Sequence, residues 1–204
     1  MKQKYKIILA SKSPRRFQLL KQAGFEFKIA DSKLNEELIL KKLKDKRPEE
    51  LVKVLSLAKA LAVLSKISSK QPYKIIAAFD TIVFCKNKII AKPKNKKDAL
   101  KKILFLSNKK HCVYTGICLI NVKEKTAITD FEKTVVYMKK ITKKEAMSYV
   151  QSKEPFGKAG AYAIQGKGKK FIEKIKGDYY NVVGLPLKRF KKMIGLALKV
   201  GPKG

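Results

Sequence analysis

The residues best suited to chemistry are two adjacent arginines, Arg15 and Arg16, in a chain whose 49 basic residues include only four arginines. An apolar run precedes them and an amphipathic pattern follows, which predicts a strand over 5–9, a tight loop and a helix over 14–23. Ser13 suits the N-cap and Pro14 the first helical position. The N–H groups of this helix start and the two guanidinium groups could bind a phosphate-rich anion. An ordinary helix start with two solvated arginines explains the pattern equally well.

Asp80 is the strongest single candidate for a catalytic carboxylate. It is the only acidic residue between Glu50 and Asp98, and it lies within an apolar run over 75–85 that predicts a central strand buried on both faces. A carboxylate there is costly unless it is paired, bound to a metal or at the strand end in a cleft. The pattern therefore predicts a catalytic or metal-binding aspartate, with a stabilising buried ion pair as the alternative.

Residues of two further types, glutamate and lysine, could join this site. Glu36 or Glu37, in a polar loop over 31–37, could complete an oxygen-rich site for a hard cation, although loop glutamates are usually solvated. Lys92 precedes Pro93, which restrains the backbone. Lys59 lies on a helix expected over 48–67, away from the centre of its apolar stripe, and by itself resembles a surface residue.

The composition excludes several kinds of chemistry. His111 is the only histidine, which argues against a Ser-His-Asp or Cys-His mechanism and against a zinc site with several histidines. Cys85, Cys112 and Cys118 are too few and too irregular for a disulfide framework and are expected to be buried thiols. The charge of +33 comes from lysines spread along the whole chain, which predicts non-specific binding of polyanions and no specific nucleic-acid partner.

The remaining pattern predicts alternating strands and helices. No apolar run reaches the roughly 18 residues of a membrane span, and no signal peptide is recognisable, so a cytoplasmic protein without a membrane partner is expected. A capping box from Thr142 to Glu145 begins another helix. Further elements are expected as a strand over 25–30, a helix over 98–106, a hairpin over 111–120 and 127–139, a glycine-rich loop over 155–168, a strand over 170–176 and a helix over 187–198.

An ordered set of motifs between about residues 6 and 190 resembles the Maf-like nucleoside triphosphate pyrophosphatases, also described as septum formation inhibitor Maf proteins. Any one motif is weak evidence, whereas the set in this order is highly specific. The motifs lie at residues 9–16, 79–81, 92–94, 113–116, 158–166 and 177–186.

The resemblance implies a fold and an activity. The fold is α/β, a mixed twisted sheet with flanking helices and two lobes around a central cleft, as in the inosine triphosphate pyrophosphatases. It would form a single Maf-like domain over 1–204, with a frayed tail from about 199. Family members cleave nucleoside triphosphates to the monophosphate and pyrophosphate with a divalent cation, Mg2+ or Mn2+. A homodimer is compatible with the resemblance.

The resemblance also assigns roles to residues. Asp80 would be the catalytic base and, with Glu36, would hold the metal; Glu37 stays open as the alternative to Glu36. The base of the nucleotide would be selected by Thr81 and Gln165, with Arg15. The triphosphate would be held by Ser11, Arg15, Arg16, Lys59 and Lys92. We expect Arg16 to face a solvent-filled cleft, so that its removal would leave the fold intact.

The loop around Lys158 and Gln165 resembles the branch of the family that acts on dTTP and UTP, and an amide such as Gln165 can pair with the alternating donor and acceptor edge of a pyrimidine. The sequence departs from the family pattern at Phe79, where a smaller residue is usual, and at Gly157, where an aspartate is usual. The alternative function is a non-catalytic nucleotide-binding regulator of cell division.

Overall fold

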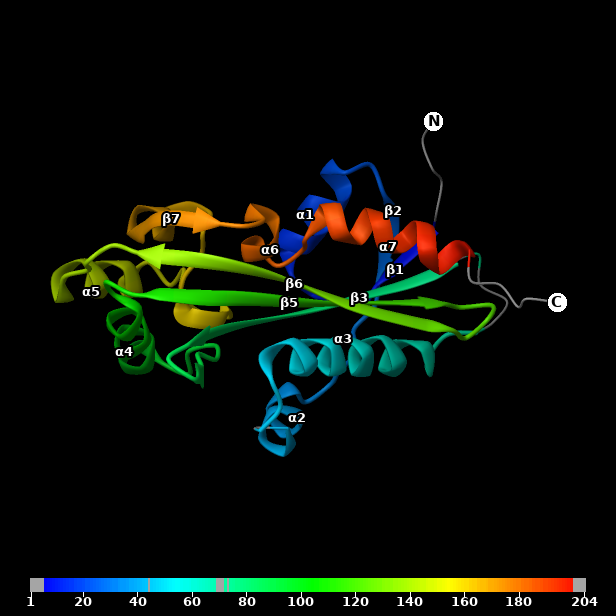
Figure 1. Ribbon diagram of the computed structural model, residues 1–204, viewed down its shortest axis with the longest axis horizontal. Coiled ribbons are helices and arrows are strands. Elements are labelled where there is room, and N and C mark those ends of the chain that lie inside the picture. The colour runs from blue at the N-terminus through cyan, green and yellow to red at the C-terminus, as the bar shows by residue number, and fades with distance from the viewer. Residues whose placement is uncertain (1–5, 44, 69–71, 73, 200–204) are drawn as a thin grey trace. The chain divides into compact units, whose positions relative to one another are not determined.

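The computed structural model describes residues 6–43, 45–68, 72 and 74–199 (Figure 1). The strands are β1 (Lys6–Leu9), β2 (Glu26–Ile29), β3 (Ile75–Cys85), β4 (Lys88–Ile89), β5 (Lys110–Asn121), β6 (Ala127–Met138) and β7 (Ile172–Lys176). The α-helices are α1 (Pro14–Gln22), α2 (Glu36–Lys42), α3 (Pro48–Leu64), α4 (Lys96–Leu106), α5 (Lys143–Gln151), α6 (Tyr179–Val183) and α7 (Leu187–Lys199). Two 3-10 helices are η1 (Ala159–Ala161) and η2 (Gly166–Phe171).

The strands of the described residues form one mixed sheet in the order β2-β1-β3-β5-β6-β7, with β4 paired to β3. β1 runs parallel to β2 and to β3, so that Ile8 lies opposite Lys28 on one side and Ile76 on the other. β4 runs antiparallel to β3, and β7 runs antiparallel to β6. The mixed α/β fold with flanking helices is confirmed.

The chain divides into two compact units. The first comprises residues 1–80, 115–132 and 184–204, and the second comprises residues 81–114 and 133–183. The long strands β3, β5 and β6 therefore each contribute to both units. The single domain over 1–204 stays a prediction, and its expected tail beyond Lys199 lies outside the described residues.

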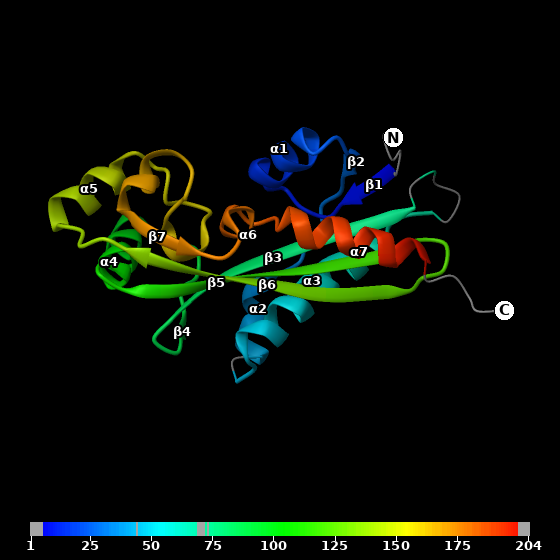
Figure 2. The same cartoon turned by 45° about the horizontal axis from the view of Figure 1, so that its top comes forward.

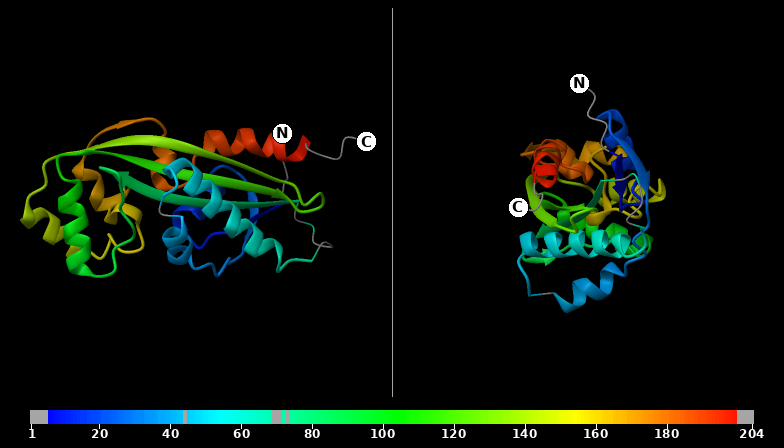
Figure 3. Two further views of the ribbon diagram at one scale, coloured as in Figure 1. Left: turned by 60° about the horizontal axis from the view of Figure 1, so that its bottom comes forward. Right: turned by 90° about the vertical axis from the view of Figure 1, so that its right-hand side faces the viewer.

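In the first unit, helix α3 covers one face of the strands, and α1 and α7 cover the other (Figures 1 and 3). On the α3 side, Ile76 and Ala78 of β3 pack with Ala60 and Val63 of α3 in one buried cluster. Because side chains alternate along a strand, Asp80 continues this row and points to the same face. The strand pattern thus directs the carboxylate toward α3.

Gly116 of β5 lets α3 approach the sheet closely. A Cβ atom at this position would overlap the carbonyl oxygen of Val52 on α3. Only glycine fits such a contact between a strand and a helix backbone. The residue therefore fixes the height of α3, which carries Lys59, above the sheet.

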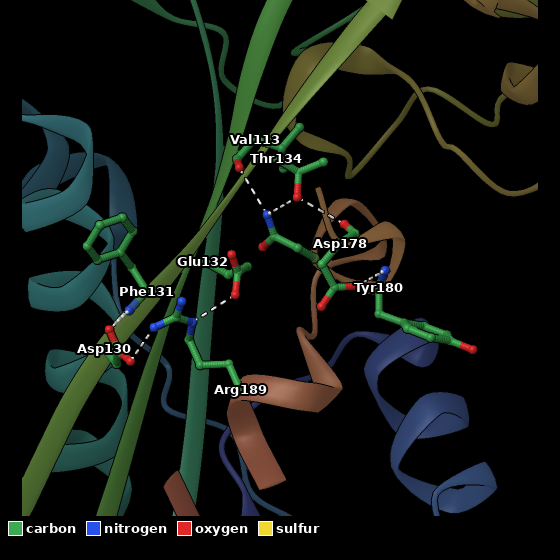
Figure 4. A network of polar contacts seen from close by, with 9 residues as sticks. Val113, Asp130, Phe131, Glu132, Thr134, Asp178, Tyr180 and Arg189 are labelled. Atoms are coloured by element: carbon green, nitrogen blue, oxygen red, sulfur yellow. Dashed lines mark hydrogen bonds and ion pairs between the residues drawn. The ribbon is translucent and has the colours of Figure 1, made fainter. Parts of the chain in front are cut away.

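The opposite face of the first unit is held by aromatic and ionic contacts with α7. Phe190 packs edge-on against Phe79 and against Phe25, with ring centroids 5.3 Å apart in both pairs. Arg189 donates to Glu132 at 2.8 Å and to Asp130 at 2.6 Å, both on β6 (Figure 4). These contacts dock α7 on the strands.

The second unit has its own core, in which side chains of β3 and β5 pack with α4 and α5. Ile103 of α4 and Tyr149 of α5 are fully buried there, and the two helices lie in contact (Figure 2). Asn181 of α6 is buried and donates to the Val113 carbonyl at 3.1 Å and to Thr134 Oγ1 at 3.0 Å. Thr134 in turn donates to the carbonyl of Asp178 (Figure 4).

Ser13 at the N-cap of α1 and Pro14 at its first position are confirmed, although Ser13 makes no side-chain capping bond and its own N–H donates to Ser11 Oγ at 3.3 Å. Other local expectations were wrong. The polar segment expected as a loop over 31–37 already contains the start of α2, and α6 was not expected. Cys112 is only half-buried, although Cys85 and Cys118 are buried free thiols as expected. The capping box of α5 is confirmed.

Candidate active site

Four of the polar side chains expected to act together form two hydrogen-bonded pairs in the first unit, Ser11 with Arg16 and Lys59 with Asp80. They come from separate elements: Ser11 follows β1, Arg16 lies in the first turn of α1, Lys59 lies on α3 and Asp80 lies on β3. Glu36, the first residue of α2, joins them through Lys59. Residues far apart in the sequence thus form one charged cluster.

Arg16 is the most tightly held member of this cluster. Its Nε donates to the Gly184 carbonyl at 2.8 Å, and its Nη1 donates to the Phe79 carbonyl at 2.9 Å and to Ser11 Oγ at 3.1 Å. The guanidinium also lies 5.7 Å from the centre of the Phe79 ring. Phe79, which differs from the family pattern, therefore contacts Arg16 through both its carbonyl and its ring.

The expectation that Arg16 faces solvent was wrong, since the residue is only 9% exposed. Planar guanidinium groups can serve several acceptors at once, and two buried carbonyls of this unit use that capacity. Arg16 therefore has a structural role whatever else it binds. Its neighbour Arg15 is half-buried.

Lys59 lies at the centre of the negative charges. Its Nζ is 2.8 Å from Glu36 Oε1 and donates to Asp80 Oδ1. The side chains of Lys59 and Asp80 are 8% and 7% exposed, whereas that of Glu36 is 31% exposed. The surface position that the sequence suggested for Lys59 was wrong, because the pairing with two carboxylates allows the ammonium group to be buried.

Glu36 is placed by a helix start. Asn35 caps α2 by accepting a hydrogen bond from the Leu38 N–H at 3.3 Å. The cap begins the helix at Glu36, whose carboxylate reaches Lys59. The side chain of Glu37, the other candidate, lies outside the described part of the structure.

The charges of the cluster influence one another. Burial lowers the pKa of Arg16 to about 10, and the carboxylates of Asp80 and Glu36 oppose this shift while the charge of Arg15 adds to it. Arg16 thus remains a cation at neutral pH. The cluster offers fixed cations beside two carboxylates that meet at one point, an arrangement suited to an anionic substrate and a hard metal ion.

Lys92 belongs to the second unit, where its backbone is fixed by α4. Lys102 Nζ donates to the Lys92 carbonyl at 3.0 Å and pairs with Asp98 at 2.6 Å. Asp98 also accepts from the Lys94 N–H at 2.9 Å. The backbone restraint expected from Pro93 is therefore reinforced by these bonds, and the Lys92 side chain is exposed.

Thr81 and Gln165 also lie in the second unit. Thr81 is half-buried on β3, and Gln165 is exposed immediately before η2. The loop of Gln165 is anchored to β3 and its neighbour, because Gly160 donates to the Ile90 carbonyl at 2.8 Å and Ile90 donates to the Val83 carbonyl at 2.7 Å. These assignments of Thr81, Lys92 and Gln165 remain predictions.

The sequence interpretation missed Tyr149 and Glu154, which organise the loop of Gln165. Glu154 accepts hydrogen bonds from the N–H groups of Lys167 and Gly168 and from the Tyr149 hydroxyl. A signal existed, because Glu154 is the only acidic residue between Glu145 and Glu173. Asp80 is isolated from other acidic residues in the same way.

The described residues contain neither a cluster of metal-ligating side chains nor a helix suited to crossing a membrane. In that part of the chain, no group of three or more His, Cys, Asp or Glu side chains is placed to hold a metal ion, so Glu36 and Asp80 would need ligands from other sources. None of the helices in the described ranges combines the length and apolar character required to cross a membrane.

Known proteins resemble this chain over most of its length. A family model described as Maf-like protein matches residues 6–196. A dTTP/UTP pyrophosphatase of Caldicellulosiruptor bescii is 42% identical over 189 residues, which cover 93% of this chain and 93% of that protein. A dTTP/UTP pyrophosphatase of Clostridium perfringens is 44% identical over 189 residues, covering 93% of this chain and 95% of its own length.

Proposed function

The chain belongs to the Maf-like protein family, and from this premise we propose that it hydrolyses dTTP and UTP to the nucleoside monophosphate and pyrophosphate. The name of the relatives, dTTP/UTP pyrophosphatase, supports this substrate class. The observation that carries the proposal is the convergence of Glu36 and Asp80 on Lys59. Such a charged centre is costly for a fold and useful for phosphate chemistry.

The triphosphate would be bound by Ser11, Arg15, Arg16, Lys59 and Lys92. A triphosphate requires several fixed cations, because negative charge is spread over many oxygens in its transition state. Arg16 is hydrogen-bonded to the Gly184 carbonyl and to Ser11 Oγ, so the side chains of Arg16 and Ser11 are held in place before a substrate arrives. Such preorganisation is the main source of electrostatic catalysis.

A divalent cation, Mg2+ or Mn2+, fits the residues present. Carboxylate oxygens are the protein ligands that both ions prefer, and Glu36 and Asp80 already bring theirs to one ammonium group. When bound, the ion would supply charge compensation for the phosphate oxygens. Two carboxylates suffice for Mg2+ sites, in which waters and phosphates provide the other ligands.

Asp80 would act as the general base. It would accept a proton from the water that attacks the α-phosphorus, and the bond from that phosphorus to the bridging oxygen would break. Pyrophosphate would leave with the bridging oxygen, and the oxygen of the water would remain on the monophosphate. Lys59, which donates to Asp80 Oδ1, would fix the orientation of the carboxylate.

The base of the nucleotide would be selected by Thr81 and Gln165, with Arg15. Gln165 is exposed and its side chain does not cap η2, so its amide can offer both a donor and an acceptor to a pyrimidine edge. The expected homodimer, the cytoplasmic location and the absence of a specific nucleic-acid partner also stay predictions.

The second candidate is a non-catalytic, nucleotide-binding regulator of cell division. The observation that favours it is that Asp80 already has a partner in Lys59, as a purely structural aspartate would. The test is incubation with dTTP, UTP, CTP and GTP in Mg2+ or Mn2+. Release of pyrophosphate from dTTP and UTP supports the proposed enzyme, whereas binding of nucleotide without turnover supports the regulator.

A further inference from the structure

The segment that carries Gln165 is held on both of its sides by one pair of side chains, the buried Tyr149 and the half-buried Glu154. Tyr149 lies on α5 and is 2% exposed, with its ring packed edge-on against Phe171 at 5.2 Å. Its hydroxyl accepts a hydrogen bond from the Ala163 N–H at 3.1 Å and donates to Glu154 Oε1 at 2.9 Å. The phenol thus ties the residue two positions before Gln165 to the carboxylate.

Glu154 holds the other side of the same segment. Its Oε2 accepts from the Lys167 N–H at 2.9 Å, and its Oε1 accepts from the Gly168 N–H at 3.0 Å. Desolvation raises the pKa of Glu154, but the two backbone N–H groups and the Tyr149 hydroxyl outweigh it and leave that pKa below its ordinary value. The carboxylate is therefore charged at neutral pH, which strengthens these bonds.

Two glycines show how closely this segment is fitted. Gly166 has a φ of +78°, and a Cβ atom there would lie 2.7 Å from Glu154 Oε2. At Gly168, a Cβ atom would lie 2.8 Å from the Tyr149 hydroxyl. The backbone on the C-terminal side of Gln165 is thus pressed against the pair.

We propose that Tyr149 and Glu154 are positioning residues that set the direction of the Gln165 amide and thereby the preference for pyrimidine nucleotides. The inference rests on the proposed function, in which Gln165 contacts the base. The geometry supports this role because three backbone N–H groups within three residues of Gln165 donate hydrogen bonds to Tyr149 or Glu154, while Gln165 itself is exposed. Neither side chain would touch the substrate.

The variants Tyr149→Phe and Glu154→Gln test this role. We expect each to raise KM for dTTP by about 5- to 50-fold and to lower the ratio of kcat/KM for dTTP over GTP by a similar factor, while kcat for dTTP changes less than about threefold. A correctly folded variant of either kind with the wild-type ratio would overturn the proposal.

Glu145→Gln is the matched control. Glu145 lies on α5 as Tyr149 does, but its carboxylate caps the start of the helix at Thr142. Like Glu154→Gln, this variant replaces a carboxylate by an amide of nearly the same shape. It weakens the start of α5 without touching the contacts of Glu154. We expect the dTTP over GTP ratio of this control to stay at the wild-type value. A fall equal to that of Glu154→Gln would assign the effect to general loosening of α5 and contradict the proposal.

A double-mutant cycle separates positioning from general loosening of the fold. In a Gln165→Ala background, Tyr149→Phe should cause no further loss of the dTTP over GTP ratio, because its effect passes through Gln165. Additive losses would contradict the proposal. If Gln165→Ala alone keeps the wild-type ratio, the assignment of the base contact in the proposed function fails as well.

Amide hydrogen exchange provides a readout that does not depend on turnover. The Ala163 N–H in Tyr149→Phe, and the Lys167 and Gly168 N–H groups in Glu154→Gln, should exchange at least about tenfold faster, while the amides of α4 keep their wild-type rates. Unchanged exchange at these three amides would overturn the proposal. A wild-type chain that hydrolyses nothing would refute the proposed function separately, and the binding ratio of α,β-imido dTTP over α,β-imido GTP would then test the preference.

Discussion

Lys59 on α3 and Asp80 on β3 form an ion pair buried between a helix and a strand, with side chains 8% and 7% exposed. The desolvation of two charges cancels much of their attraction, so such a pair adds little net stability. Removing one partner is costly, because the other charge is left buried. The pair therefore links the candidate chemistry to the stability of the fold, and the two can be measured on the same variants.

Asp80→Asn should separate these roles. We expect kcat/KM for dTTP to fall by about 100- to 10,000-fold, the range of a lost general base. The free energy of unfolding should fall by less than about 3 kcal/mol, because the amide oxygen and Glu36 still face the Lys59 ammonium group. Asp130→Asn is the control, since Asp130 pairs with Arg189 in the same unit. Full dTTP hydrolysis by a stable Asp80→Asn protein would refute the catalytic role.

Arg16→Ala should unfold more easily than the wild-type chain, contrary to the expectation from the sequence. The carbonyls of Phe79 and Gly184 each lose a buried donor, and each loss costs about 1–3 kcal/mol. Urea denaturation should therefore show a loss of about 2–6 kcal/mol. Arg15→Ala, at a half-buried neighbour, should cost less than about 1 kcal/mol. Equal stability of the two variants would contradict the structural role of Arg16.

Gly116→Ala should disturb the active site from a distance. The added Cβ overlaps the Val52 carbonyl oxygen and must push α3, which carries Lys59, away from the sheet. We expect a loss of roughly 2–4 kcal/mol in stability and a lower kcat for dTTP. Gly195→Ala, in α7 with open space around it, should be neutral or stabilising by up to about 1 kcal/mol. Thermal unfolding of both variants checks the contrast.

The stability of the fold should decline in mild acid because of His111. Burial lowers the pKa of His111 from 6.5 to about 4, and Nε2 lies 2.7 Å from the Tyr162 hydroxyl. A histidine whose pKa is depressed in the folded state stabilises the fold at pH values above its pKa in the unfolded chain. That contribution is complete above about pH 6.5 and is lost as the pH falls toward 4, up to roughly 3 kcal/mol.

His111→Gln checks this pH dependence. Glutamine does not titrate, and its amide can still bond to the Tyr162 hydroxyl. The slope of unfolding free energy against pH between 6.5 and 4 should therefore be shallower for the variant than for the wild-type chain. Identical slopes would show that other groups control stability in this range.

The fold was predictable because its signals are local. The apolar run of β3 and the capping box at Thr142 each specify an element through neighbouring residues, and both are confirmed. Helix α2 was missed because its seven residues begin at a single asparagine cap within a polar stretch. The five-residue α6 was missed too; its Asn181 is held by Val113 and Thr134, which are distant in sequence.

The candidate site was only partly predictable for the same reason. The isolation of Asp80 among apolar residues marked it correctly as a costly carboxylate, but the sequence cannot show which cation meets it. Lys59 looked exposed because its burial depends on Glu36 and Asp80, which are distant in the chain. The acceptors of Arg16 are backbone carbonyls, and a carbonyl leaves no trace in residue identity.

The products formed from dTTP in water enriched in 18O test the central claim most directly. With Mg2+ or Mn2+ and without added pyrophosphatase, the wild-type protein should yield dTMP that carries one 18O and unlabelled pyrophosphate, while Asp80→Asn yields neither above background. UTP should react in the same way, and GTP much more slowly. Release of orthophosphate from dTTP, or of labelled pyrophosphate with unlabelled dTMP, would contradict attack at the α-phosphorus and with it the proposed reaction.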